Sequence, residues 1–318
     1  MKKITVVIPT YNEELNIESA YNRVKNVFNS KLTNYDFQIL YIDNASKDNS
    51  QNIIRSLCEK DNRVQAIFNN TNFGFSKSSF YGLTQAEGDA AVMMFADMQD
   101  PPEVIPEMVA KWEDGYKVVI GVKNKSKESR IMYHVRGVYY KLLDKISEVE
   151  HIKQYDGFGL YDAEFVLHLR ELNDSLPYLR GIVAEIGPAR ATVEYVQDVR
   201  KEGKSSFNFW KYYDVAMLGI TSSSKAILRL ATFLGMILSC MCIIIAVLTL
   251  ILKILFWDYY SVGSAAVLIG VFFVGGIQLF FLGFIGEYIA NINYRTMRHP
   301  IVLEKERINL TRVIKQNE

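Results

Sequence analysis

Three carboxylates fall within seven residues of this chain, where residues 95–103 read F-A-D-M-Q-D-P-P-E. They are Asp97, Asp100 and Glu103. Carboxylate oxygens are hard ligands that suit Mg²⁺ or Mn²⁺, above all where a diphosphate supplies further oxygens. The two prolines of the stretch favour the first turn of a helix, so an acidic loop that only caps a helix is the plain alternative. The stretch therefore predicts either a metal and diphosphate site or a helix cap.

The acidic stretch follows a short apolar run that reads as a buried strand, and helices alternate with strands on either side of it. Strands are expected at residues 4–8, 37–42, 64–68, 90–95 and 117–122. Helices are expected at about residues 15–27, 46–60, 76–86 and 102–112, the second capped by Ser46 or Asp48. This alternation predicts βαβ units and an α/β domain with a mostly parallel sheet.

Polar side chains gather where three of these strands end. They are Tyr11 and Glu13 after the first strand, Asp43 after the second, and Asp97, Gln99 and Asp100 after the fourth. Carboxyl ends of parallel strands share one edge of the sheet, and ligands of open α/β folds bind along that edge. We therefore expect these residues to form a nucleotide-type site.

Two common nucleotide-binding motifs are absent from the sequence. No G-x-G-x-x-G follows the first strand, and the G-K-S of residues 203–205 has Asp198 where a P-loop needs glycine. The net charge of +1 gives no global basic field for nucleic acid. A dehydrogenase, a P-loop kinase and a nucleic-acid-binding protein are therefore disfavoured.

Two long uncharged runs set the last third of the chain apart. Residues 231–252 and 261–286 contain no Asp, Glu, Lys or Arg. At ~1.5 Å per residue the first run spans about 33 Å, enough for a hydrocarbon core of roughly 30 Å. Buried core helices are the alternative. Basic residues flank the pair of runs, so the positive-inside rule predicts a transmembrane hairpin with both termini in the cytoplasm.

Two further segments have the composition of a membrane surface. Residues 126–147 combine apolar residues at helical spacing with basic residues and tyrosines, which suits either an interfacial helix or an ordinary surface helix. Residues 206–228 begin with an aromatic cluster suited to the headgroup layer. The expected organisation is a cytoplasmic catalytic domain at 1–205, an interface segment at 206–228, a hairpin at 229–290 with spans near 230–253 and 261–286, and a cytoplasmic basic tail at 291–318.

Seven stretches in order carry a resemblance to a known family. They read V-V-I-P-T-Y-N-E-E (6–14), I-D-N-A-S-K-D-N-S (42–50), N-F-G (72–74), A-D-M-Q-D-P-P-E (96–103), G-F-G-L-Y-D (157–162), R-K-E-G-K-S (200–205) and G-E-Y (286–288). This succession resembles inverting family 2 glycosyltransferases. More narrowly, it is similar to bacterial polyprenyl-phosphate glycosyltransferases with two C-terminal membrane spans, relatives of dolichyl-phosphate mannose synthase.

The resemblance implies a GT-A fold and a reaction at the inner membrane. Glucose would pass from UDP-glucose to polyprenyl (undecaprenyl) phosphate for cell-envelope glycan modification, with Mg²⁺ or Mn²⁺ as cofactor. N-acetylglucosamine, mannose or an aminoarabinose-type sugar are alternative donors. Gly275 and Gly276 would permit a homo-oligomer through the hairpin.

The resemblance also assigns roles to single residues. It places the uridine on Pro9, Tyr11, Glu13 and Asp43, and assigns Gln99 to the donor nucleotide as well. The metal is placed on Asp97, with Gln99 and Asp100 close by, and the acceptor near Asp156. Phosphate groups are placed on Arg200, Lys204 and Ser205, and the catalytic residues would be Asp97, Asp156 and Arg200. The chain departs from the family pattern at Phe95, where the usual D-x-D has its first carboxylate, at Asn44, where a second acid is usual, and at residues 156–159, where many relatives have G-D-F-R. Arg200 and Lys204 could equally serve as headgroup anchors.

Three other functions compete with this interpretation. A processive polysaccharide synthase needs a Q-x-x-R-W element, but Lys201 follows residues 197–200, and two spans are too few for a channel. A non-catalytic membrane adaptor is compatible with Phe95, although the retained Asp97 opposes it. A transporter is disfavoured because neither span carries a charged residue.

Overall fold

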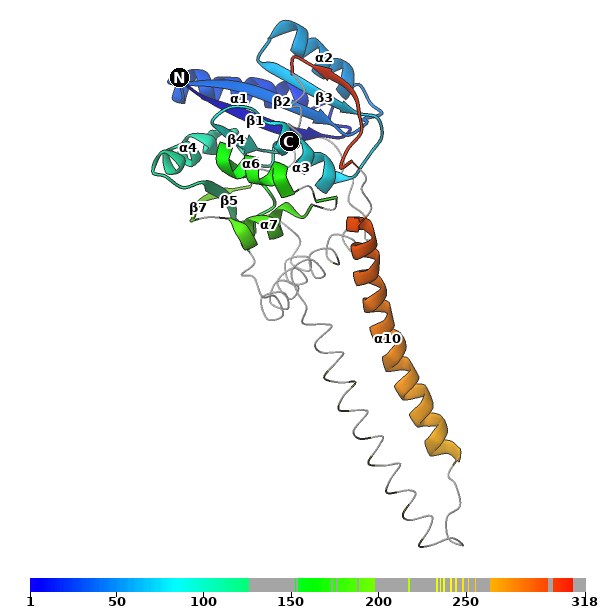
Figure 1. The fold of residues 1–318 in the computed structure, drawn as a ribbon. Coiled ribbons are helices and arrows are strands. Elements are labelled where there is room, and N and C mark those ends of the chain that lie inside the picture. Colours follow the sequence, from blue (N-terminus) through cyan, green and yellow to red (C-terminus); the bar gives the residue numbers. More distant parts are fainter. Residues whose placement is uncertain are drawn as a thin grey trace, which may run out of the picture.

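The computed structural model describes residues 1–125, 154–172, 177–187, 189–197, 264–296 and 300–310, with a few scattered positions between these ranges. The described residues form an eight-stranded sheet with helices on both faces (Figure 1). Also among the described residues, the long helix α10 (Ser264–Thr296) extends away from this domain.

The sheet is mostly parallel, as the alternation of strands and helices predicts. Its strands are β1 (Lys2–Thr10), β2 (Tyr35–Asp43), β3 (Val64–Asn69), β4 (Ala90–Met93), β5 (Val118–Lys125), β6 (Gly159–Asp162), β7 (Arg190–Val196) and β8 (Glu304–Ile308). Their order is β7-β5-β6-β4-β1-β2-β3-β8. Strand β6 is antiparallel to both of its neighbours, β8 is antiparallel to β3, and the remaining pairs are parallel.

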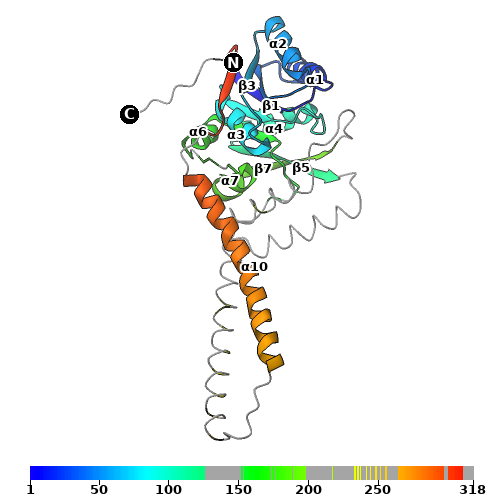
Figure 2. The same ribbon diagram turned by 90° about the vertical axis from the view of Figure 1, so that its right-hand side faces the viewer.

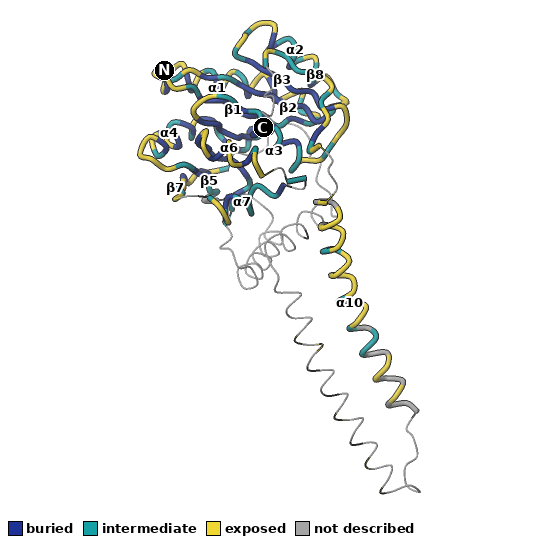
Figure 3. The backbone as a smooth tube through the Cα atoms, in the orientation of Figure 1, coloured by how far each residue is buried: buried dark blue, intermediate teal, exposed yellow. Residues whose placement is uncertain are grey.

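Helices cover the two faces because successive side chains of a buried strand point to opposite sides. In β1, Val6 and Ile8 pack on one face and Val7 packs on the other, and all three are fully buried. Figure 3 shows that buried residues concentrate in the central strands of the sheet. One face is covered by α1 (Ile17–Lys31), α2 (Ser50–Lys60) and α4 (Ile105–Glu113). The other is covered by α3 (Phe75–Gln85), α6 (Ala163–Leu172) and α7 (Leu179–Ile186).

Each predicted strand and helix up to residue 122 is observed within a few residues, whereas β6, α6, α7, β7 and β8 were not predicted. A 3₁₀ turn, Pro102–Val104, precedes α4, so the two prolines do open a helical segment. Strand β4 ends at Met93, two residues earlier than predicted, which leaves Phe95 and Asp97 beyond the ladder. Asp48 Oδ1 accepts a hydrogen bond from Ser50 N at 3.0 Å, whereas Ser46 binds the neighbouring loop instead of capping α2.

Strand β8 returns to the domain after α10 and closes the edge of β3. Its neighbour Asn309 donates from Nδ2 to the carbonyls of Cys58 and Val64, each at 2.9 Å. An Arg55–Glu306 ion pair of 2.7 Å joins β8 to α2. An uncovered edge strand invites pairing with other chains, so this strap protects the sheet and ties the end of α10 to it (Figure 2).

Helix α10 exposes apolar side chains along its length, among them Val267, Val271, Leu279 and Leu282. Within the part of the chain that the structure describes, no helix has the length and apolar character of a membrane span. Most of the first uncharged run, 231–252, lies outside the described residues, as do the predicted interfacial helix at 126–147 and nearly all of 206–228. The hairpin and these two segments stay predictions.

Candidate functional site

The ends of the central strands meet at one edge of the sheet. Thr10 pairs with Asp43 at the ends of β1 and β2, and Asn44 N donates to Thr10 O at 2.9 Å. Because β6 runs antiparallel to β4, its first residue, Gly159, pairs with Met93 at the end of β4. The loop that leads into β6 therefore lies beside the acidic stretch.

Hydrogen bonds lock the loops after β1 and β2 together. Asn12 N donates to Ser46 Oγ at 2.9 Å, and Lys47 N donates in return to Asn12 Oδ1 at 2.8 Å. Within the first loop, Asn16 Nδ2 donates to Glu13 Oε2 at 2.6 Å. The predicted uridine residues Pro9, Tyr11 and Glu13 lie on this fixed frame, each partly exposed.

Asp43 is fully buried and keeps one carboxylate oxygen without a partner among the described residues. Its Oδ2 accepts hydrogen bonds from Ser46 N at 3.0 Å and Gln51 Nε2 at 2.7 Å, whereas Oδ1 accepts none. Burial raises the pKa of Asp43, and the hydrogen bonds from Ser46 and Gln51 offset only part of this rise. A buried acceptor of this kind suits an N–H group of a ligand, such as that of a nucleobase.

Asn44 organises the loop that follows β3. Its Nδ2 donates to Asn72 Oδ1 at 2.9 Å, and its Oδ1 accepts from Phe73 N at 3.0 Å and Asn69 Nδ2 at 3.1 Å. An aspartate could accept these bonds but could not donate to Asn72. The departure from the usual second acid therefore has a structural reason.

Lys123, at the end of β5, lies among three carboxylates. Its Nζ is 2.5 Å from Asp156 Oδ2, and only 14% of the Lys123 side chain is exposed. Burial alone would lower the pKa of Lys123. The negative charges of Asp156, Asp100 and Asp97 raise it by more than burial lowers it, so the net shift is upward. The structure thus brings Asp97 and Asp156 to one cluster, with a cation that sequence reasoning missed.

Asp100 is the buried member of this cluster. Its Oδ1 accepts a hydrogen bond from Tyr195 Oη at 2.5 Å, and its Oδ2 has no partner among the described residues. Burial and the charge of Asp156 raise the pKa of Asp100 well above its usual range. Nearby, Gln197 Nε2 donates to Gln99 Oε1 at 3.1 Å, so Gln99 joins the end of β7 to the acidic stretch.

Two buried tyrosines hold the loop that carries Asp156. Tyr161 Oη donates to Gly157 O at 2.7 Å, and Tyr155 Oη lies 2.5 Å from Tyr161 Oη. Since the Tyr161 proton is used on Gly157, Tyr155 is the donor to Tyr161. Gly157 has a φ of +121°, a conformation that favours glycine. The loop is thereby fixed from within the core.

Left-handed backbone conformations concentrate around this edge of the sheet. Asn12, Ala45 and Met98 have φ between 55° and 59° in the loops after β1, β2 and β4, and Gln154 has φ 58° in the Asp156 loop. Each such conformation costs roughly 1–3 kcal/mol and persists only where neighbouring contacts enforce it. Its repetition in all four loops indicates a functional edge.

The donor set at this edge fits a divalent cation that also takes ligands from a substrate. Asp97 is partly exposed and accepts from Gln99 N at 3.2 Å, and the buried Asp100 Oδ2 lies in the same stretch. The described residues contain no group of three His, Cys, Asp or Glu side chains placed to hold a metal alone. Mg²⁺ is commonly bound by one or two carboxylates together with phosphate oxygens, so this donor set suits it.

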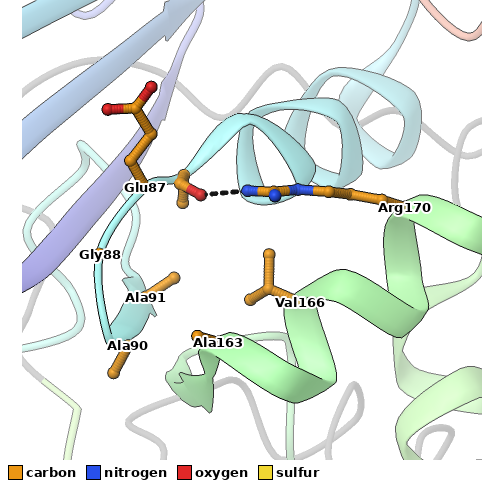
Figure 4. A pocket seen from close by; sticks show the side chains of 8 residues that line it. Glu87, Gly88, Ala90, Ala91, Ala163, Val166 and Arg170 are labelled. Atoms are coloured by element: carbon orange, nitrogen blue, oxygen red, sulfur yellow. Dashed lines mark hydrogen bonds between the residues drawn. The ribbon is translucent and has the colours of Figure 1, made fainter. Parts of the chain in front are cut away.

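A cavity of about 230 Å³ lies at a different place, between the end of α3 and α6 (Figure 4). Alanine, glycine and valine residues line most of it, and Arg170 Nη2 donates to Ala86 O at 2.5 Å. Arg170 Nε also donates to Thr84 O at 2.6 Å. The arginine therefore binds the last carbonyls of α3, which is a structural role.

The predicted phosphate-binding residues Arg200, Lys204 and Ser205 lie outside the described residues. Sequence reasoning missed Lys123, Tyr195 and the two tyrosines of the Asp156 loop. Lys123 follows an apolar strand and could have been noticed as a charge at a strand end. No local signal marks the tyrosines, because their role depends on how β6 pairs.

Comparison with known proteins agrees with this architecture. Residues 5–168 match the profile described as "Glycosyl transferase family 2". Among solved structures, mannosyl-3-phosphoglycerate synthase from Rubrobacter xylanophilus aligns with a TM-score of 0.51 at 16% identity, over 74% of this chain and 75% of that one. That similarity concerns the fold alone.

Curated relatives align along nearly the whole chain. An uncharacterised glycosyltransferase of Bacillus subtilis is 34% identical over 94% of this chain and 92% of its own length. The bactoprenol glucosyl transferase of Shigella phage SfX is 33% identical over 96% of this chain and 99% of its own length. A prophage bactoprenol glucosyl transferase homolog of Escherichia coli is 32% identical, over 94% and 97% respectively.

Proposed function

Because this chain belongs to glycosyltransferase family 2, we propose that it transfers glucose from UDP-glucose to the phosphate of a polyprenol. Family membership makes it a glycosyltransferase. The names of the phage and prophage relatives support glucose as the sugar and bactoprenol (undecaprenol) phosphate as the acceptor. N-acetylglucosamine, mannose and an aminoarabinose-type sugar are the donors to compare with it.

The observation that carries the proposal is the arrangement along one sheet edge. At one end Asp43 offers a buried acceptor for a base N–H, and at the other Asp97, Asp100, Asp156 and Lys123 gather where β4, β5 and β6 meet. A nucleotide sugar needs such a succession, with a base site, a diphosphate site and a transfer site. The loops between them are fixed before any ligand binds, which favours catalysis by positioning.

The reaction needs little proton chemistry. An oxygen of the lipid phosphate attacks the anomeric carbon, the bond from that carbon to the UDP oxygen breaks, and UDP leaves with the electron pair. The lipid phosphate is already ionised near neutral pH, so a strong base is unnecessary. Asp156, held by Lys123, then orients the sugar or the acceptor.

Charge stabilisation is the larger requirement. Asp97 would hold Mg²⁺ or Mn²⁺, which supplies positive charge to the diphosphate as it departs. Phosphate groups would also be bound by Arg200, Lys204 and Ser205. Tyr11, Pro9 and Glu13 would hold the base and ribose together with Asp43.

The proposal places the enzyme at the inner face of the plasma membrane, with the lipid phosphate within reach of the site. The uncharged runs at 231–252 and 261–286 would form the membrane hairpin, with both termini cytoplasmic. The exposed apolar side chains of α10 support burial of that helix in an apolar environment. Strand β8 would then keep the catalytic domain close to the bilayer, because it begins only eight residues after α10 ends.

The test is UDP release by the detergent-purified full chain. UDP-glucose and the three alternative donors are supplied with Mg²⁺ or Mn²⁺, with and without undecaprenyl phosphate. Release from UDP-glucose that depends on both the metal and the lipid supports the proposal. Lipid-dependent UDP release from a different donor would identify that sugar, in place of glucose, as the one transferred. The absence of lipid-dependent UDP release from every donor would reject the proposed reaction.

A further inference from the structure

Two phenylalanine rings meet beside the acidic stretch. Phe75 is the first residue of α3, and Phe95 lies two residues before Asp97. Their ring centroids are 5.2 Å apart at an angle of 49°. Phe75 is 43% exposed and Phe95 is partly exposed, so the pair forms an apolar surface open to solvent within a polar site.

The pair lies between the two halves of the site. On one side, Phe75 follows the loop that Asn72 fixes by its hydrogen bond to Asn44, the residue after the buried Asp43. On the other, the Phe95 ring reaches to 3.5 Å from the point where a side chain on Gly157 would begin, next to Asp156. The rings thus adjoin both parts of the site, where a ligand that extends from Asp43 to Asp156 can contact them.

We propose that Phe75 and Phe95 form a stacking surface for an apolar face of the donor sugar, an inference that rests on the proposed function. A pyranose ring presents C–H groups on a face free of axial hydroxyls, and aromatic rings bind such groups through apolar contact. In a gluco-configured hexose every ring hydroxyl is equatorial, and in UDP-glucose the axial oxygen at C1 carries the diphosphate on one face. The opposite face presents only C–H groups in axial positions and can meet the rings. An axial hydroxyl on the contacting face would lose its water without gaining a hydrogen bond.

This surface also determines how strongly the site selects between donor sugars with and without a given hydroxyl group. A carboxylate at position 95 would require a hydroxyl partner and reject sugars that lack it, whereas an apolar ring discriminates much less. Donors with a deoxy position or an apolar substituent over the rings are therefore accepted. The proposed substrate class is a UDP-hexose with one apolar C–H face. The site discriminates only weakly between sugars that differ in the groups over the two phenylalanine rings.

The experiment compares the binding of UDP-glucose with that of UDP by the full chain in detergent with Mg²⁺. Phe75→Ala and Phe95→Leu should weaken UDP-glucose binding roughly three- to tenfold and leave UDP binding unchanged. Phe95→Tyr keeps the ring and should retain UDP-glucose affinity. Leu172→Ala, which truncates an exposed apolar residue of α6 (45% exposed), is the matched control and should change neither affinity.

Three results would overturn the inference. An equal loss for UDP and UDP-glucose would mean that the rings contact the nucleotide. Unchanged donor binding with a raised KM for undecaprenyl phosphate would mean that they face the acceptor. Wild-type protein that binds neither UDP nor UDP-glucose would reject the proposed function itself, and the stacking surface with it.

Discussion

Lys123 and Asp156 form an ion pair of 2.5 Å between Nζ and Oδ2, and this pair joins the end of β5 to the loop before β6. The two side chains are 14% and 28% exposed, so water screens them only partly. The carboxylates of Asp100 and Asp97 also act on Lys123 and help to raise its pKa. The pair thus fixes Asp156 and moderates the negative charge of a site that, in the proposed function, accepts a diphosphate.

Replacing Lys123 by Met should lower turnover about 10- to 100-fold, because removing one partner of a shielded pair leaves the other charge unbalanced. The measurement is sugar transfer at saturating donor. Lys117→Met is the matched control: Lys117 pairs with Asp162 at 3.1 Å near the start of the same strand, away from the site. Equal losses in the two variants would contradict a specific role for Lys123.

Asp97→Asn should reduce transfer at least ~100-fold while the fold is kept. The side chain is partly exposed and its Oδ1 accepts from Gln99 N, a bond that an amide oxygen can retain. Mg²⁺-dependent UDP binding should weaken in parallel, measured by titration with and without EDTA. Near-normal turnover in this variant would remove Asp97 from the metal site.

Asp43→Asn tests the buried acceptor of the base site. Its amide oxygen can keep the bonds from Ser46 N and Gln51, which places an N–H group where Oδ1 stood. The amide N–H group of the variant and the N–H group of the nucleobase would then face each other as two donors, and UDP affinity should fall about 10- to 100-fold. The melting temperature should not fall, because the carboxylate it replaces is buried with a raised pKa. Unchanged UDP affinity would exclude a base contact at Oδ1.

Tyr161→Phe removes the hydrogen bond to Gly157 O without changing the core volume. We expect kcat to fall about tenfold and donor affinity to stay, because the bond positions the Asp156 loop and touches no nucleotide. Tyr41→Phe is the control, since Tyr41 is also buried and gives one hydrogen bond of 3.1 Å to a backbone carbonyl, Ile17 O. Tyr41→Phe should lose about 1 kcal/mol of stability, and Tyr161→Phe should lose more, because it also removes the acceptor of the buried Tyr155 hydroxyl. If only stability changes in Tyr161→Phe, the tyrosine has no positioning role.

Asp100→Asn tests the buried carboxyl through the pH dependence of stability. Burial and Asp156 raise the pKa of Asp100, so the folded chain keeps a proton that the unfolded chain releases at about pH 4. Stability from this group is therefore full below about pH 4 and is lost as pH rises toward the raised pKa. The melting temperature of the variant relative to wild type should increase between about pH 5 and pH 8. A difference that stays constant over this range would show that Asp100 does not titrate as proposed.

The local elements of the domain follow from the sequence because each is set by short-range patterns. Apolar runs of β-branched residues predict β1, β2 and β3, and polar residues after them mark the edge where Asp43 and Asp97 lie. The same patterns are silent on β6, a four-residue strand whose direction depends on its partners β4 and β5. Strand β8 is even harder to predict from the sequence, because charged residues form most of it and the segment has the composition of a basic tail.

The sequence by itself determined the α/β class, the positions of the first five strands along the chain and the residue types that follow them. Only the tertiary structure decided that β6 runs antiparallel, which brings Asp156 beside the acidic stretch, and that Lys123 and Tyr195 meet the carboxylates there. The physical reason is that strand ladders join residues distant in sequence, and a reversed strand moves its first residue to the opposite edge of the sheet. Residue types thus set the available chemistry, and strand pairing sets which groups can act together.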